Sequence, residues 1–172
     1  KNDLPPLPQE DPVRALALST SHPVWLVERM LSLLGREEAE AFLRENNRTA
    51  PLTVQVNPLR TTAESLRAEL EAAGIDVRPH PWVPGCLELS GAGNPASLPS
   101  FREGRFLIQD AAARLVTLAA APEPGWRVLD LCAAPGGKSF SAAMAMGDRG
   151  EILACDLYPK KLTRIDEGAA RL

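Results

Sequence analysis

The stretch LDLCAAPGGKS, residues 129–139, decides the fold of this chain. It overlaps the end of an apolar run, WRVLDLC (126–132), and a second apolar run, EILACD (151–156), follows an alanine- and methionine-rich segment. Nearly continuous apolar runs of this length are typical of strands that are buried on both faces of a parallel sheet and joined by a helix. We therefore predict a βαβ unit that begins a doubly wound α/β domain.

The glycine pair lies in the turn between the first strand and its helix. Open α/β sheets bind nucleotides at such turns, because the carboxyl end of the strand meets the positive end of the helix dipole. Gly136 and Gly137 let a ligand approach the backbone closely. Asp156 ends the second strand 19 residues after Gly137, where a carboxylate accepts hydrogen bonds from ribose hydroxyls. A tight turn alone would explain the glycines, but both features together predict a nucleotide site.

Three kinds of nucleotide ligand compete for this turn. The phosphate-binding motif G-x-x-x-x-G-K-[ST] is nearly matched from Cys132 to Ser139, but Cys132 stands where the first glycine shapes the phosphate cradle. The dinucleotide motif G-x-G-x-x-G does not occur in the turn. S-adenosylmethionine carries no phosphate and needs close backbone approach and acidic acceptors, so it fits these residues best. A P-loop nucleotide hydrolase stays as the alternative.

The chain before this unit predicts a small α/β domain. Helical spacing of apolar residues predicts helices over 21–34 and 36–47, and LTVQVN (52–57) alternates as a half-buried strand does. A helix should follow from Thr61 to Gly74, and then two short strands. Downstream, RFLIQ has the composition of a strand, and Asp110 is placed to cap the helix after it.

The expected domains divide the chain into three parts. Residues 1–13 hold four prolines with mixed charges, so residues 1–19 are expected to be a linker. The accessory α/β domain should cover residues 20–110, and the nucleotide-binding domain should begin with residues 111–172. A doubly wound sheet needs about five or more strands. We therefore expect this chain to be part of a longer polypeptide.

Composition excludes several classes of protein. The 19 basic and 22 acidic residues give a net charge of −3, so the chain lacks the basic excess of a self-sufficient nucleic-acid binder. No apolar run approaches the ~18 residues of a membrane span, and the polar start has no signal-peptide core. Three scattered cysteines and two histidines predict neither a metal site nor a disulfide framework. These features favour the cytoplasm.

The motifs together carry a family resemblance. LDLCAAPGGKS with its acidic strand end resembles the first motif of the Sun/Fmu-type ribosomal RNA (cytosine-5) methyltransferases of the NOL/NOP/Sun family. Upstream landmarks that resemble the same family are SHPVWLVERM, VNPLR and GRFLIQDAAARLV. The resemblance implies an accessory RNA-binding domain over 20–110, followed by the first βαβ part of a Rossmann-type methyltransferase domain over 111–172. A noncatalytic RNA-binding module for ribosome assembly would keep the same fold.

The resemblance also assigns the site residues. It implies S-adenosylmethionine as cofactor, ribosomal RNA as partner and Asp156 as the ribose ligand, with Asp130 shaping the methionine end. The cofactor loop would consist of Cys132, Ala133, Ala134, Pro135, Gly136, Gly137 and Lys138.

No catalytic residue is expected in this chain. The family's catalytic cysteines lie in Pro-Cys and Thr-Cys motifs, and neither motif occurs in these 172 residues. We therefore expect the chain alone to be inactive. No pattern of basic residues is interleaved with Trp25, Trp82 and Trp126, so we expect them to pack in the core rather than to stack on bases.

Overall fold

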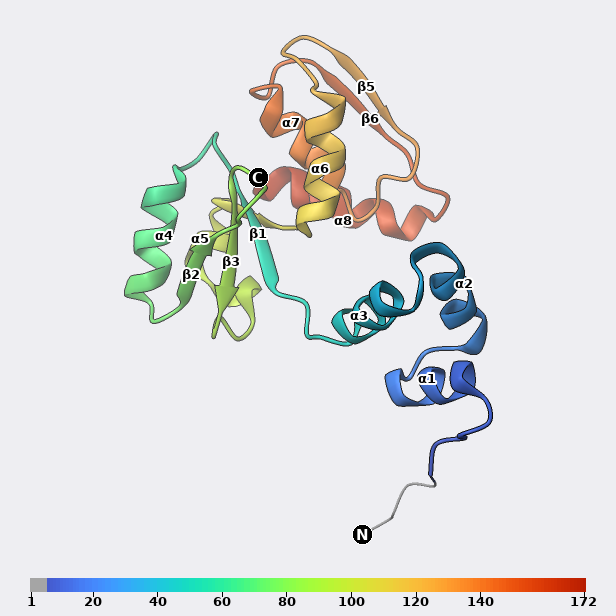
Figure 1. Cartoon of the computed structure of the whole chain (residues 1–172). Coiled ribbons are helices and arrows are strands. Elements are labelled where there is room, and N and C mark those ends of the chain that lie inside the picture. The colour runs from blue at the N-terminus through green and yellow to red at the C-terminus, as the bar shows by residue number, and fades with distance from the viewer. Residues whose placement is uncertain (1–5) are drawn as a thin grey trace. The chain divides into compact units, whose positions relative to one another are not determined.

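A computed structural model describes residues 6–172 of the chain (Figure 1). The chain divides into two compact units, one that ends at Ala50 and one that spans Pro51–Leu172. Each unit is described by itself.

The first unit consists of helices. They are α1 (Pro12–Thr20), α2 (Val24–Leu34) and α3 (Arg36–Asn46). Their shared core holds the buried side chains of Leu16, Ala17, Val27 and Leu43. The Asn47 side-chain amide donates to the Thr20 carbonyl oxygen over 2.6 Å, so the end of α3 is tied to the end of α1.

Helix α1 corrects the prediction of a linker over residues 1–19. Asp11 caps this helix, because its Oδ1 accepts a hydrogen bond from the Arg14 N–H over 2.9 Å. Pro12 occupies the first helical position, where a missing N–H costs nothing and the fixed φ suits a helix. The linker prediction is therefore wrong over residues 12–19, and the first five residues of the predicted linker lie outside the described part of the chain.

The second unit begins with a four-stranded antiparallel sheet. Its strands are β1 (Leu52–Val56), β2 (Asp76–Pro79), β3 (Cys86–Ser90) and β4 (Phe106–Ile108), in the order β2-β3-β1-β4. Helix α4 (Ala63–Ala72) joins β1 to β2, and the short helices η1 (Pro95–Ser97) and α5 (Pro99–Arg102) join β3 to β4. Thr62 caps α4 by accepting from the Ser65 N–H, so the cap lies one residue after the expected Thr61.

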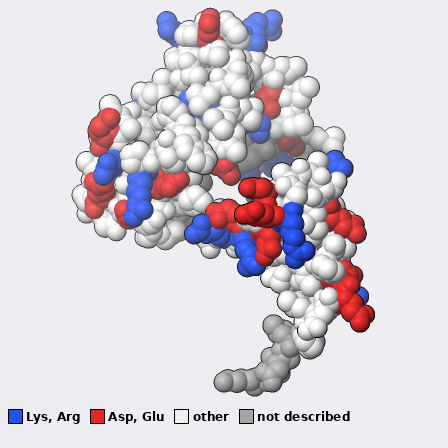
Figure 2. Space-filling view, viewed as in Figure 1, with Lys and Arg blue, Asp and Glu red and all other residues white. Residues whose placement is uncertain are grey.

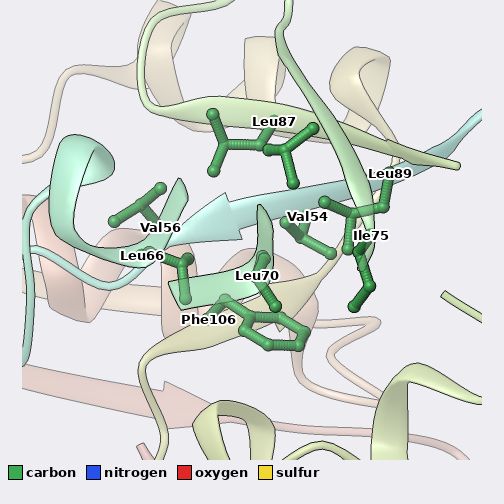
Figure 3. Packing of buried hydrophobic residues seen from close by; sticks show 9 residues of the cluster. Val54, Val56, Leu66, Leu70, Ile75, Leu87, Leu89 and Phe106 are labelled. Atoms are coloured by element: carbon green, nitrogen blue, oxygen red, sulfur yellow. The ribbon is translucent and has the colours of Figure 1, made fainter. Parts of the chain in front are cut away.

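The core of this sheet lies against α4. Figure 3 shows Leu66 and Leu70 of α4 among side chains from the strands, including Val54 and Phe106, and all four are fully buried. The opposite face of β1 is covered as well, since the buried Gln55 donates from Nε2 to Met144 Sδ over 3.6 Å. The strand is therefore not half-buried as its alternating sequence predicts.

The predicted βαβ arrangement is confirmed in the C-terminal part of the second compact unit. Strands β5 (Arg127–Asp130) and β6 (Glu151–Ala154) pair in parallel, with Arg127 opposite Glu151, and α7 (Gly137–Ala145) connects them. Helix α6 (Ala111–Ala120) precedes β5, and its predicted cap is confirmed, because Asp110 Oδ1 accepts from the Ala112 N–H over 2.7 Å. Helix α8 (Pro159–Arg171) follows β6.

The βαβ unit and the four-stranded sheet pack together. Leu107 of β4 shares a buried cluster with Phe140 and Met144 of α7. At the end of α8, the Arg171 guanidinium donates to the Phe101 carbonyl oxygen over 2.7 Å. The division into compact units at residue 50 therefore does not coincide with the domain boundaries expected after residues 19 and 110.

The three tryptophans correct another expectation. The exposed fractions are 66% for Trp25, 83% for Trp82 and 48% for Trp126, so none of them lies in the core. In α2 the core position is taken by Val27, which is fully buried. Trp82 lies in the turn between β2 and β3. Trp126 directly precedes strand β5, in which Leu129 is also exposed.

Within residues 6–172, no helix is long and apolar enough to cross a membrane. The same part of the chain contains no group of three or more His, Cys, Asp or Glu side chains placed to hold a metal ion.

Candidate cofactor-binding site

The two parallel strands continue their pairing beyond their ends. The Cys155 N–H donates to the Asp130 carbonyl oxygen over 2.8 Å, and the Ala133 N–H donates to the Cys155 carbonyl oxygen over 2.9 Å. These bonds hold the residues after β5 beside those after β6. The loop CAAPGGK and Asp156 therefore lie together at the carboxyl edge of the sheet, where open α/β sheets bind ligands.

Asp156 is fixed by backbone donors. Its Oδ1 accepts from the Tyr158 N–H over 3.0 Å, and its Oδ2 accepts from the Ala134 N–H over 3.2 Å. The hydrogen bond from Tyr158 is the largest cause that lowers the pKa of this carboxyl, with smaller contributions from Ala134 and the Lys161 ammonium. Asp156 is therefore an oriented anion, and each oxygen keeps a lone pair for a ligand hydroxyl.

Gly136 is required by the shape of the loop. Its φ of +109° lies in the left-handed region, and a Cβ at this position would overlap the Phe140 ring. Its N–H donates to the Ala133 carbonyl oxygen over 2.6 Å, and its own carbonyl accepts from the Phe140 N–H over 2.8 Å. Gly136 therefore closes the turn and caps α7 in one residue.

Gly137 begins α7 beside a buried amide. A Cβ on Gly137 would lie 3.2 Å from Gln109 Nε2, so the glycine allows β4 and α7 to approach each other closely. The buried side chain of Gln109 therefore packs against the loop backbone at Gly137.

Asp130 organises the start of the same loop. Its Oδ2 accepts from the Ser139 hydroxyl over 2.8 Å, and its Oδ1 accepts from the Cys132 N–H over 3.3 Å. Asp130 thus holds the loop from both of its ends. Sequence reasoning missed the structural role of Ser139, although its position at the first turn of the helix was a usable signal.

A hollow of about 480 Å³ lies beside the loop between α6, β5 and α7. Asp130, Lys138 and Ser139 contribute to its lining, and Thr117 and Val128 lie among the other lining residues. Asp156 does not line this hollow. Of the two acidic residues at this edge of the sheet, Asp130 alone lines the hollow.

The loop does not fit a phosphate cradle. Such a cradle needs free backbone N–H groups that point at the anion. Here the N–H groups of Cys132, Ala133, Ala134 and Gly136 donate to acceptors of the chain itself, and Pro135 has no N–H. Only the N–H groups of the first turn of α7 remain for a ligand. This arrangement disfavours a P-loop nucleotide hydrolase.

Both halves of the chain match families of known proteins. Residues 22–95 match the family model described as Methyltr_RsmF/B-like, ferredoxin-like domain, and residues 117–172 match the model of 16S rRNA methyltransferase RsmB/F. The chain is 37% identical over 163 residues to a probable ribosomal RNA small subunit methyltransferase B of Bacillus subtilis, with 95% of the chain aligned. The chain belongs to the Sun/Fmu-type ribosomal RNA methyltransferases.

Other members of the methyltransferase family support this assignment. The ribosomal RNA small subunit methyltransferase B of Salmonella paratyphi A is 33% identical over 151 residues, which cover 88% of this chain and 35% of that protein. The crystal structure of a methyltransferase homolog from Pyrococcus horikoshii superposes with a TM-score of 0.84 at 27% identity, covering 94% of this chain and 53% of that one. The chain spans 36% of the Bacillus subtilis relative.

The three cysteines of this chain differ in their surroundings. Cys132 is exposed in the loop, Cys155 is half-buried after β6, and Cys86 is buried in the sheet. All three thiols are free. Burial raises the pKa of the Cys86 thiol, so this side chain stays neutral and packs as a small apolar group.

Proposed function

We propose that the full-length protein transfers a methyl group from S-adenosylmethionine to C5 of a cytosine in ribosomal RNA. In this proposal the chain supplies the cofactor loop, residues 132–138, and the ribose ligand Asp156. Membership in the ribosomal RNA methyltransferase family supports methyl transfer to RNA. The cofactor and the position of the methyl group rest on the loop and on the resemblance of its motif.

The observation that carries the proposal is the oriented Asp156 carboxylate beside the glycine turn. Its two oxygens are held by the N–H groups of Tyr158 and Ala134. The vicinal hydroxyls of a ribose can donate to both oxygens at once, because two such hydroxyls match the spacing of a carboxylate. The lowered pKa of Asp156 keeps it ionised at neutral pH, as an acceptor for two donors must be.

The remaining loop residues suit a ligand without phosphate. Four loop N–H groups are already bonded within the chain, which leaves the first turn of α7 to meet a carboxylate at the methionine end. Lys138 in that turn is exposed and lines the hollow beside Asp130. Its ammonium would add a second positive contact for a carboxylate or for the cytosine.

The bound cofactor would supply an electrophilic methyl group. The family resemblance implies that a cysteine thiolate adds to C6 of the cytosine, so that C5 becomes nucleophilic enough to accept the methyl. The Pro-Cys and Thr-Cys motifs of those cysteines do not occur in these 172 residues. We assign neither role to Cys86, Cys132 or Cys155, because none of them lies in a Pro-Cys or Thr-Cys motif.

The test is a methyl-transfer assay with the full-length protein, S-adenosylmethionine and unmodified small-subunit ribosomal RNA. Digestion of the RNA and mass spectrometry should find 5-methylcytidine, and Asp156→Ala should reduce its formation. Methylation at another atom would contradict the C5 assignment. Binding of the RNA with no methyl transfer would instead favour a noncatalytic module for ribosome assembly.

A further inference from the structure

The turn between β2 and β3 is built around His80. The His80 N–H donates to the Cys86 carbonyl oxygen over 2.9 Å, which closes the turn. The His80 Nδ1 faces the N–H groups of Trp82 and Val83 at 3.3 and 3.1 Å and accepts from both. The His80 side chain is only 11% exposed, so this acceptor is shielded from water. The backbone of the turn is therefore held in one conformation.

The same turn presents Trp82 to solvent. Val83 beside it is buried, while Trp82 is 83% exposed. The rings of His80 and Trp82 meet at a centroid distance of 6.0 Å with their planes at 84°, which supports the indole from one side. Pro81 precedes Trp82 and Pro84 follows Val83, and both prolines restrict the backbone of the turn further. The turn is ordered, buries the side chain next to Trp82 and leaves the indole open, so the face of the indole is available to a ligand.

The surface beside the turn is hollowed and of mixed charge, and Trp82 itself does not line the hollow. A hollow of about 230 Å³ lies between the turn and the start of α4, lined among others by His80, Pro84 and Arg67. Arg67 is paired with Glu71 over 2.7 Å, and Figure 2 shows basic and acidic side chains interspersed over α4. Charge alone gives this surface little attraction for a polyanion. An exposed indole binds any unpaired base by stacking, since every base has a π-face.

We propose that Trp82 is a stacking platform for an unpaired base of the ribosomal RNA substrate. The inference rests on the proposed function, because that function makes RNA the ligand of the full-length protein. It assigns to the turn at residues 80–85 a contact with single-stranded RNA that is separate from the cofactor loop. His80 acts as a positioning residue for Trp82, through the two backbone N–H groups that it accepts.

The test compares two exposed tryptophans in the full-length protein. Trp82→Ala should weaken binding of a fluorescent single-stranded 12-nucleotide RNA of mixed sequence by about 5- to 100-fold. Trp82→Phe should retain most of the affinity, because a phenyl ring still stacks. Trp25→Ala is the matched control, since Trp25 is also exposed but lies on α2 in the other unit. A fully paired RNA duplex of the same sequence should bind Trp82→Ala and the unchanged protein equally.

Two results would overturn the proposal. The first is an unchanged affinity of Trp82→Ala for single-stranded RNA, and the second is an equal loss in Trp25→Ala. Calorimetry with S-adenosylmethionine separates this inference from the proposed function, because Trp82→Ala should bind the cofactor like the unchanged protein. If the unchanged protein transfers no methyl group while single-stranded RNA binding still depends on Trp82, the C5 methyltransferase is refuted and the stacking contact stands.

Discussion

The N–H of Ala134 donates to Oδ2 of Asp156 over 3.2 Å, across 22 residues of sequence. This bond joins the loop after β5 to the end of β6. Asp156 therefore has two roles, because the carboxylate proposed to bind the ribose also holds the cofactor loop in its place.

The first prediction concerns how the contribution of the Asp156 carboxylate to stability depends on pH. The pKa of Asp156 is lowered in the folded state, mainly by the Tyr158 N–H. A group with a depressed folded pKa stabilises the protein above its unfolded pKa, and this contribution is lost as the pH falls through the folded pKa. Asp156→Asn should therefore reduce the free energy of unfolding at pH 7 and reduce it less at pH 3. Urea unfolding at both pH values measures this, and a larger effect at pH 3 would contradict it.

The second prediction concerns Gly136. Gly136→Ala should be more destabilising than Gly125→Ala, although both glycines have φ in the left-handed region, +109° and +91°. Both variants carry the backbone penalty of about 1–2 kcal/mol. Only Gly136 adds an overlap with the Phe140 ring, since nothing lies within 4 Å of a Cβ on Gly125. Overpacking of this kind costs about 1–3 kcal/mol more. Equal loss of stability in thermal unfolding would show that the ring moves aside.

The third prediction concerns the hydrogen bond between Ser139 and Asp130. Ser139→Ala removes the donor to a carboxylate over 2.8 Å from a buried position. Bonds to charged groups contribute about 1.5–3 kcal/mol, so urea unfolding should show a loss in this range. Ser97→Ala is the control, because the Ser97 hydroxyl also donates, to the Asn94 carbonyl oxygen over 2.7 Å, but is exposed. A loss no greater than in this control would remove the assigned role of Ser139.

Sequence predicted the parts of the fold that depend on local pattern. The apolar runs around Leu129 and Ile152 predicted the parallel strands, and Asp110 was found as a cap because capping needs only neighbouring residues. The glycine turn and Asp156 were likewise placed together by topology alone.

The errors arose where the tertiary environment decides. Four prolines near the start favoured a linker, but Pro12 after the capping Asp11 begins a helix. The alternation around Gln55 predicted one exposed face, which α7 covers. Trp82 was expected in the core because no basic residues are interleaved around it, yet its turn is folded around His80 instead. Each of these three outcomes depends on contacts with other residues, so the type of the single residue does not predict it.

The fourth prediction concerns the 172-residue chain by itself. It should not methylate RNA when S-adenosylmethionine is supplied, because it lacks the Pro-Cys and Thr-Cys motifs of the family's catalytic cysteines. A radiolabelled methyl-transfer assay on unmodified ribosomal RNA measures this. Turnover that survives replacement of Cys86, Cys132 and Cys155 by serine would show that the covalent mechanism does not apply.

The central claim is that Asp156 and the glycine turn bind S-adenosylmethionine. Isothermal titration of the full-length protein with S-adenosylmethionine tests it most directly. Asp156→Ala should weaken binding by about 1–3 kcal/mol, the scale for leaving hydrogen-bonding groups of a bound ligand without partners. Circular dichroism should confirm that the variant is folded. A folded Asp156→Ala protein with unchanged affinity for S-adenosylmethionine would contradict the account.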